Sequence, residues 1–123
     1  MIIKRQFHFD AAHKLINVGP EKCKNLHGHT YVMKVEVQGP LKNGMVIDFG
    51  ELDKIVKESV VNKWDHKYLN DLLPEGFEST VENLVLIAAE LIDEHLPVGV
   101  RVYSVTIFEG LNSSAIWTHE DKN

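Results

Sequence analysis

The sequence of 123 residues lacks the features that would indicate a secreted or membrane protein. Its single cysteine, Cys23, has no partner for an internal disulfide, which fits a reducing compartment. No apolar run approaches the roughly 20 residues that a helix needs to cross a bilayer. The N-terminal segment also lacks the basic and then apolar order of a signal peptide. These absences favour the cytoplasm as the location of the protein.

The chain is also poor in positive charge, with 13 Lys and Arg against 18 Asp and Glu and a formal net charge of −5. A protein of this charge has no general attraction to nucleic acid or to anionic membranes, so we expect neither as a partner. Apolar residues make up 44% and charged residues 25%, as in soluble globular proteins. The length indicates one domain, residues 1–123, that can bury a core without disulfides.

Alternating apolar and polar residues predict strands at both ends of the chain. We expect them over residues 2–13, 27–38, 100–109 and 114–119. In the third of these, Tyr103 is expected to share the apolar face with Val105 and Ile107.

Two amphipathic helices are expected between the second and third strands. Asp48 followed by Glu51 is typical of the start of the first, and Ser79 with Glu82 forms an S-x-x-E capping box at the start of the second. The predicted order ββααββ indicates an α+β protein in which both helices cover one face of an antiparallel sheet. So small a sheet leaves two edges open, which favours oligomer formation.

The motif His27-Gly28-His29 lies on a predicted strand, so both imidazoles leave the same face, with Cβ atoms about 6–7 Å apart. Two imidazoles can converge on one metal across that gap, and zinc in catalytic sites commonly takes three protein ligands. Strand parity favours His13 as the third ligand over His8, which falls on the polar face. The alternative is a group of surface or hydrogen-bonded histidines without a metal.

Cys23 lies four residues before His27, among charged and polar neighbours. A nearby lysine or Zn²⁺ would lower the pKa of its thiol and make the thiolate available as a base or nucleophile. Two other interpretations stay open. Cys23 is either a fourth zinc ligand, which would close the metal site, or a small buried hydrophobic residue.

Two further positions carry acidic groups of interest. Asp65 beside His66 is a candidate acid–base unit, although adjacent side chains on a strand diverge, so their pairing requires a turn; the alternative is an ordinary polar loop. Glu109 continues an apolar strand face, where a carboxylate needs a partner such as a ligand edge with adjacent N–H donors. Its alternative is a side chain that points into water at the end of the strand.

Several segments, taken together and in this order, resemble the 6-pyruvoyltetrahydropterin synthase superfamily over essentially the whole chain. They are FDAAH, CKNLHGHTY, DFGELD, WDHKYLN, STVENL and IFEG. Such a collinear set is far more specific than any single motif. The resemblance implies a tunnelling fold (T-fold), in which a four-stranded antiparallel sheet with two helices on one face assembles into an oligomeric barrel. The typical assembly is a homohexamer of two trimers, with active sites at the subunit interfaces.

The resemblance also implies roles for individual residues. The residues that match the family's zinc (Zn²⁺) ligands are His13, His27 and His29. Those that match its catalytic cysteine and acid–base pair are Cys23, Asp65 and His66. Those that match pterin-binding positions are Glu109, Ser79 and Thr80.

The spacing C-x-x-x-H-G-H from Cys23 to His29 is similar to that of the bacterial and archaeal branch of 6-carboxytetrahydropterin synthases in the queuosine pathway. That branch implies conversion of 7,8-dihydroneopterin triphosphate to 6-carboxytetrahydropterin with release of acetaldehyde and triphosphate. Two alternatives stay open. One is a pyruvoyl-type synthase, which eliminates triphosphate and retains the side chain. The other is a non-catalytic, zinc-stabilised module that binds pterins or a protein partner.

Overall fold

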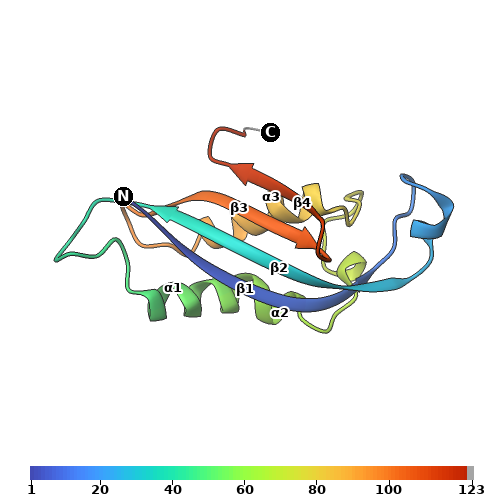
Figure 1. Ribbon diagram of the computed structural model, residues 1–123, viewed down its shortest axis with the longest axis horizontal. Helices are drawn as coiled ribbons and strands as arrows, with labels where there is room; N and C mark the ends of the chain where they lie inside the picture. The colour runs from blue at the N-terminus through green and yellow to red at the C-terminus, as the bar shows by residue number, and fades with distance from the viewer. Residues whose placement is uncertain (122–123) are drawn as a thin grey trace.

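The computed structural model describes residues 1–121, so the last two residues of the expected 1–123 domain lie outside the described part. One antiparallel sheet has the strand order β1-β2-β3-β4 (Figure 1). Its strands are β1 (Ile2–His13), β2 (His27–Gln38), β3 (Arg101–Glu109) and β4 (Ser113–Thr118). The strands expected from the alternation are therefore confirmed, with shifts of one residue at the ends of the last two.

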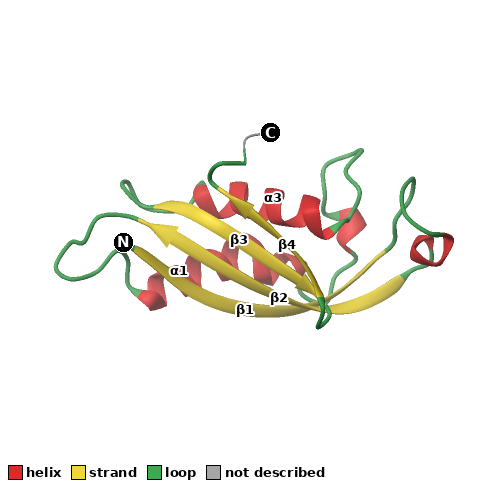
Figure 2. Cartoon of the chain, turned by 45° about the horizontal axis from the view of Figure 1, so that its top comes forward, coloured by secondary structure: helices red, strands yellow, loops and turns green. Residues whose placement is uncertain are grey.

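The main helices lie on the same face of the sheet, as Figures 1 and 2 show, which confirms the expected ββααββ arrangement. Within the described residues, no helix is long and apolar enough to cross a membrane. The helical elements are α1 (Phe49–Val56), the π-helical turn η2 (Lys57–Val61), α2 (Asn62–Trp64) and α3 (Val81–Asp93). Two short 3-10 turns, η1 (Glu21–Lys24) and η3 (Leu69–Asp71), lie in the connecting segments.

The helix starts confirm one expected cap and correct the other. At α1, the Asp48 carboxylate accepts a hydrogen bond from the Glu51 amide at 3.2 Å, as expected. At α3, the N-cap is Thr80 and not Ser79, because the Thr80 hydroxyl accepts from the Asn83 amide at 3.3 Å. Ser79 is fully buried one residue earlier, and its hydroxyl bonds other partners. The N-cap of α3 therefore lies one residue later than the S-x-x-E pattern indicates.

A register shift in β3 corrects the expected facing of Tyr103. Opposite β2, Glu36 pairs with Ser104 and Val37 pairs with Val102, so Tyr103 is the extra residue of a β-bulge. Val102 therefore takes the buried place beside Val105. Tyr103 is half-buried and packs against His119, with ring centroids 4.7 Å apart and ring planes tilted by 38°.

The core lies between the helices and the sheet face that carries the apolar rows of β1, β2 and β3. Phe9 and Tyr31 stack within it at 5.1 Å between ring centroids. Its fully buried side chains include Met33, Val35, Leu52, Val60, Leu69, Leu84, Ile92 and Ile107. Burial of this apolar face stabilises the sheet and fixes which side chains point toward the helices.

β1 and β2 continue beyond the end of β3, as a two-stranded extension visible in Figure 1. The last pair between β2 and β3 is Tyr31 with Glu109, whereas β1 and β2 stay paired as far as His13 with His27. The histidine motif of β2 thus lies on the extension, next to the loops that precede β2 and α3.

Candidate functional site

Three imidazoles converge on the helix-facing side of this extension. His13 is the register partner of His27, and His29 lies one alternation further along β2, opposite Ala11. Ring centroids are 4.6 Å apart for His13 and His27, 5.1 Å for His13 and His29, and 4.9 Å for His27 and His29. One ring nitrogen from each lies within 4.8 Å of the others. His8 is exposed on the polar row of β1, away from this cluster.

Backbone carbonyls hold the opposite ring nitrogens of two of these histidines. The Nδ1–H of His13 donates to the Ser79 carbonyl at 2.8 Å, and the Nδ1–H of His27 donates to the Asn25 carbonyl at 2.7 Å. This bonding places the proton on Nδ1 and leaves the Nε2 lone pair of each ring free. Burial lowers the pKa of His13, which also favours its neutral form at neutral pH.

The donor set fits a zinc ion. The Nε2 atoms of His13 and His29 are buried and have no hydrogen-bond partner among the described residues, and such orphaned nitrogens are costly unless a ligand takes their lone pairs. Imidazoles whose Nδ1–H groups are held by backbone carbonyls, as those of His13 and His27 are, are common zinc ligands. Within residues 1–121, Cys23 does not join the cluster of converging donor atoms, so the structure holds three histidine donors there and not four ligands.

A cavity of about 310 Å³ opens beside the imidazole cluster. His13 and His27 line it together with Cys23, Thr80 and Glu109, so groups from η1, α3 and β3 meet in one place. The Cys23 thiol is partly accessible there. Glu109 lines this cavity, and its side chain is 28% exposed.

Asp65 and His66 form a direct pair, with 3.0 Å between Asp65 Oδ1 and His66 Nδ1. The turn that such pairing requires is present, because His66 adopts the left-handed conformation with φ of 60°. Asp65 Oδ1 also accepts from the Asp10 amide at 3.0 Å. This hydrogen bond lowers the pKa of Asp65, and His66 lowers it further.

The Asp65–His66 pair does not share the cavity of Cys23. His66 lines a second hollow with Asp10, Gly28 and His29, on the other side of the extension. Within one chain, the structure therefore brings the three imidazoles, the thiol and Glu109 together, while His66 shares a hollow with His29 but not with Cys23 or Glu109.

Ser79 and Thr80, expected together at the pterin, take different positions. Thr80 lines the cavity at the start of α3. Ser79 is buried behind His13, where its hydroxyl lies 3.1 Å from His13 Nδ1 and its carbonyl accepts from the same nitrogen. Ser79 contacts the imidazole rather than the open cavity.

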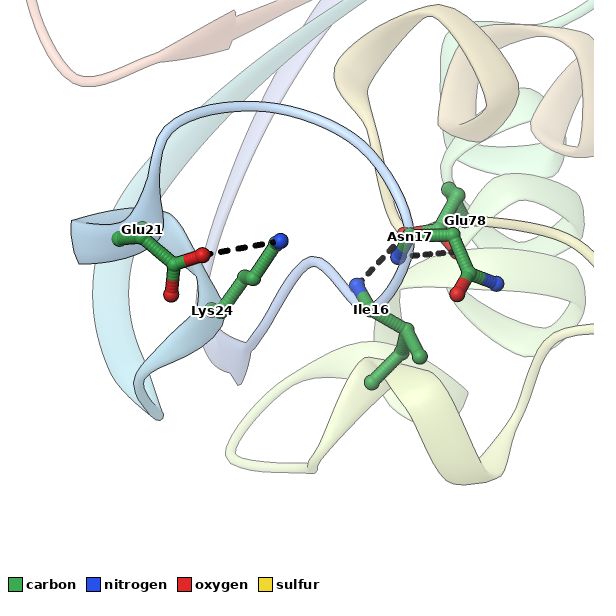
Figure 3. A network of polar contacts seen from close by, with 5 residues as sticks. All are labelled: Ile16, Asn17, Glu21, Lys24 and Glu78. Carbon is green, nitrogen blue, oxygen red and sulfur yellow. Dashed lines mark hydrogen bonds and ion pairs between the residues drawn. The ribbon is translucent and has the colours of Figure 1, made fainter.

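Sequence reasoning missed two residues that organise the site, Glu78 and Asn70. The Glu78 carboxylate accepts from the amides of Ile16 and Asn17 at 2.7 and 3.3 Å and so fastens the loop that carries Cys23, as Figure 3 shows. Asn70 bonds the backbone just after His13. Both contacts join residues more than 50 positions apart, and no local pattern signals them.

Comparisons with known proteins agree with this arrangement. A sequence model of the family described as 6-pyruvoyl tetrahydropterin synthase matches residues 2–120. A dihydroneopterin monophosphate aldolase of Pyrococcus furiosus is 39% identical over 102 residues, covering 83% of each chain. A 6-carboxy-5,6,7,8-tetrahydropterin synthase of Haemophilus influenzae is 42% identical over 88 residues, 68% of this chain and 61% of that relative. The solved structure of Caenorhabditis elegans 6-pyruvoyl tetrahydropterin synthase superposes with a TM-score of 0.83 at 28% identity, covering 96% and 94% of the chains.

Proposed function

The chain belongs to the 6-pyruvoyl tetrahydropterin synthase family, and from this membership we propose that it is a 6-carboxy-5,6,7,8-tetrahydropterin synthase. It converts 7,8-dihydroneopterin triphosphate to 6-carboxytetrahydropterin with release of acetaldehyde and triphosphate. The product serves queuosine biosynthesis in the cytoplasm. The spacing of Cys23 to the histidine motif and the Haemophilus influenzae relative support this branch of the family.

The observation that carries the proposal is the cavity in which the Cys23 thiol and the Glu109 carboxylate adjoin the buried imidazole cluster. A thiol, a carboxylate and an open metal position are the groups that proton movement on the side chain of a bound pterin requires. A purely structural zinc site would instead enclose the ion with four protein ligands.

His13, His27 and His29 would hold Zn²⁺ through their ring nitrogens. A bound zinc ion polarises oxygen atoms of the substrate and makes their protons more acidic. Glu109 accepts hydrogen bonds from the guanidine-like edge of the pterin, since a carboxylate pairs with two adjacent N–H groups. This anchor sets the side chain of the substrate against Cys23, whose thiolate moves a proton as a base.

His66, oriented by Asp65, is the partner acid or base in this proposal. Because His66 lines a different hollow from Cys23, we propose that a neighbouring subunit supplies the pair. The assembly is a homohexamer, a dimer of trimers, in which the active site combines the thiol of one chain with the acid–base pair of another. The separation of the two half-sites within one chain supports this arrangement.

The triphosphate of the substrate requires cationic contacts. Arg5 is held in a two-point ion pair with Asp53, at 2.8 Å for both hydrogen bonds, so its guanidinium is already engaged. Lys22 and Lys24 lie in η1 beside Cys23 and suit this role by position. Lys24 also contacts the exposed carboxylate of Glu21 at 3.3 Å, through a single nitrogen rather than a two-point pair.

The experiment that tests the proposed reaction is incubation of the zinc-loaded protein with 7,8-dihydroneopterin triphosphate. We expect acetaldehyde, triphosphate and 6-carboxytetrahydropterin in equal amounts. Triphosphate release with a pyruvoyl product and no acetaldehyde would instead assign the pyruvoyl-type reaction. A parallel incubation with dihydroneopterin monophosphate tests for the aldolase reaction named for the Pyrococcus furiosus relative. If the protein cleaved the monophosphate and left the triphosphate unchanged, our proposal would be contradicted.

Cys23→Ala distinguishes an enzyme from a non-catalytic module. We expect the variant to retain zinc, because Cys23 lies outside the imidazole cluster, and to lose turnover. An unchanged rate would show that the thiol has no catalytic part.

Subunit mixing tests the shared active site. Cys23→Ala and His66→Ala are each expected to be inactive as pure proteins. When the two are unfolded, mixed and refolded together, some interfaces combine an intact thiol with an intact acid–base pair, and activity should return. Mixtures that stay inactive, although they assemble, would place both groups in the same subunit's site.

A further inference from the structure

We propose that Asn70 is a positioning residue for the metal site, which fixes the end of β1 so that the ring of His13 presents Nε2 to the ion. The inference rests on the proposed function, since it assigns this role toward the zinc ion. Asn70 lies in η3, is half-buried and touches neither the cavity of Cys23 nor the imidazole cluster directly.

The side-chain amide of Asn70 pairs with both backbone groups of Lys14, the residue after His13. Asn70 Oδ1 accepts from the Lys14 amide at 3.1 Å, and Asn70 Nδ2 donates to the Lys14 carbonyl at 2.8 Å. β1 ends at His13, so this amide takes the place of a strand partner at the next residue. A side-chain amide suits this purpose because it offers a donor and an acceptor together.

The two hydrogen bonds between Asn70 and Lys14 form a clamp on the end of β1, and Ser79 links this clamp to the imidazole of His13. Its hydroxyl lies 3.1 Å from Asn70 Oδ1 and 3.2 Å from the Lys14 carbonyl, and it can donate its one proton to either oxygen. The Ser79 carbonyl accepts from His13 Nδ1 at 2.8 Å. Asn70 therefore fixes both the backbone that carries His13 and the residue that holds its Nδ1–H.

The position of Asn70 is itself fixed by burial and backbone pairing. Its neighbour Leu69 is fully buried in the core. Earlier in the same segment, the Ala12 amide donates to the Lys67 carbonyl at 3.0 Å, and the His66 amide donates to the Asp10 carbonyl. Residues 65–70 thus form a strap along the end of β1, and its last residue closes on Lys14.

The consequence for metal binding follows from ring orientation. With Nδ1–H held by a carbonyl, His13 keeps one tautomer and one ring plane. The ring therefore needs neither rotation nor proton transfer before Nε2 binds an ion. Without the clamp, Lys14 and Ser79 lose their shared partner, and the ring of His13 can rotate or change tautomer.

The test compares Asn70→Ala with wild type and with Asn83→Ala. Asn83 is a matched control because its half-buried amide also makes a backbone hydrogen bond, to the Glu78 carbonyl at 3.0 Å, but does not bond Lys14 or Ser79. Zinc affinity is measured by competition with a chromophoric chelator on metal-stripped, folded protein. We expect Asn70→Ala to lose roughly 10-fold in affinity, the lower end of the range for removed hydrogen-bond partners of metal ligands, because Asn70 acts through Lys14 and Ser79. Asn83→Ala should stay close to wild type.

A second readout separates positioning from loss of fold. ¹⁵N spectra of the metal-free imidazoles, recorded above the ordinary histidine pKa of about 6.5, should show the Nδ1–H tautomer of His13 in wild type and a mixture in Asn70→Ala. If Asn70→Ala fails to fold, Ser79→Ala serves instead, because it removes the hydroxyl link while the carbonyl that holds His13 remains.

The outcomes are distinct. Equal zinc affinity in Asn70→Ala and wild type, or an equal loss in Asn83→Ala, would overturn the inference. A wild-type protein without zinc affinity would overturn the metal site proposed above. In that case the tautomer of His13 still decides the role of Asn70: an unchanged tautomer in Asn70→Ala refutes it.

Discussion

The carboxylate of Glu109, the last residue of β3, lies 3.2 Å from Nε2 of His29, near the start of β2. The contact lacks hydrogen-bond geometry. Nε2 of His29 therefore has no hydrogen-bond partner among the described residues, although it lies beside a negative charge. An acid at this place both adjoins the imidazole cluster and faces the cavity of Cys23.

Glu109→Ala is expected to weaken pterin binding more than zinc binding. A hydrogen bond to a charged group is worth about 1.5–3 kcal/mol, so the loss of the anchor should raise the Kd for the pterin roughly 10- to 100-fold. The three imidazole donors remain in the variant, so zinc affinity should change less. Pterin binding is measured by fluorescence titration and zinc by chelator competition. An unchanged Kd for the pterin would remove the anchoring role.

His8→Ala and His29→Ala should differ in their effect on zinc. His8 is exposed on the polar row of β1, so its removal should leave zinc content unchanged. His29 supplies a buried ring nitrogen to the cluster, and its removal should lower the affinity by at least about tenfold. Metal analysis of both purified proteins gives the answer. Loss of zinc in His8→Ala would mean that His8 does not lie on the face of β1 opposite the imidazole cluster.

Thr80→Ala should destabilise the protein by about 0.5–2 kcal/mol, because the hydroxyl caps the first turn of α3. Thr80→Ser keeps an oxygen that can accept from the Asn83 amide and should recover most of this stability. Urea unfolding of both variants measures the effect. If the two variants were equally destabilised, the cap would not be the cause.

The ion pair between Arg5 and Asp53 predicts a pH-dependent effect. The hydrogen bond from the Arg5 guanidinium lowers the pKa of Asp53 from its ordinary 3.8. Since the folded carboxyl binds its proton less readily than the unfolded one, its contribution is present above pH 3.8 and is lost as the pH falls below that value. Asp53→Asn should therefore be less stable than wild type at neutral pH, and the difference should shrink in acid.

Urea midpoints of wild type and Asp53→Asn at neutral and acidic pH measure this difference. Glu58→Gln is the control, because Glu58 is exposed and forms no ion pair within residues 1–121. A difference that stays constant from neutral to acidic pH would contradict the assignment to the Asp53 charge.

Much of the fold could be predicted because its strands have one buried face. Alternation alone located β1 and β2 and placed His13, His27 and His29 on the face that the structure gives them. The bulge at Tyr103 could not be predicted in this way, since alternation assumes an unbroken register. The cap at α3 was misplaced by one residue because Ser79 and Thr80 are both good caps, and the tertiary contact with His13 decides between them.

Only those residues of the candidate site that stand out by their type and local spacing could be predicted from the sequence. The histidine motif and the lone thiol stand out in the sequence, and Glu109 stands out as an acid on an apolar row. Asn70 and Glu78 act through backbone groups more than 50 positions away, so only the folded chain shows what they do. The separation of Asp65 and His66 from Cys23 likewise depends on the three-dimensional course of the strap.

That strap carries the Asp65–His66 pair at its beginning and the Asn70 clamp on Lys14 at its end. Genetic scans of this protein should consequently find two neighbouring classes of defect within residues 65–70. Changes near the start would spare metal content while impairing turnover, and changes at the final position would impair both together. A short deletion within residues 65–70 should impair both turnover and zinc content. A shortened segment cannot keep His66 and Asn70 in their places at the same time.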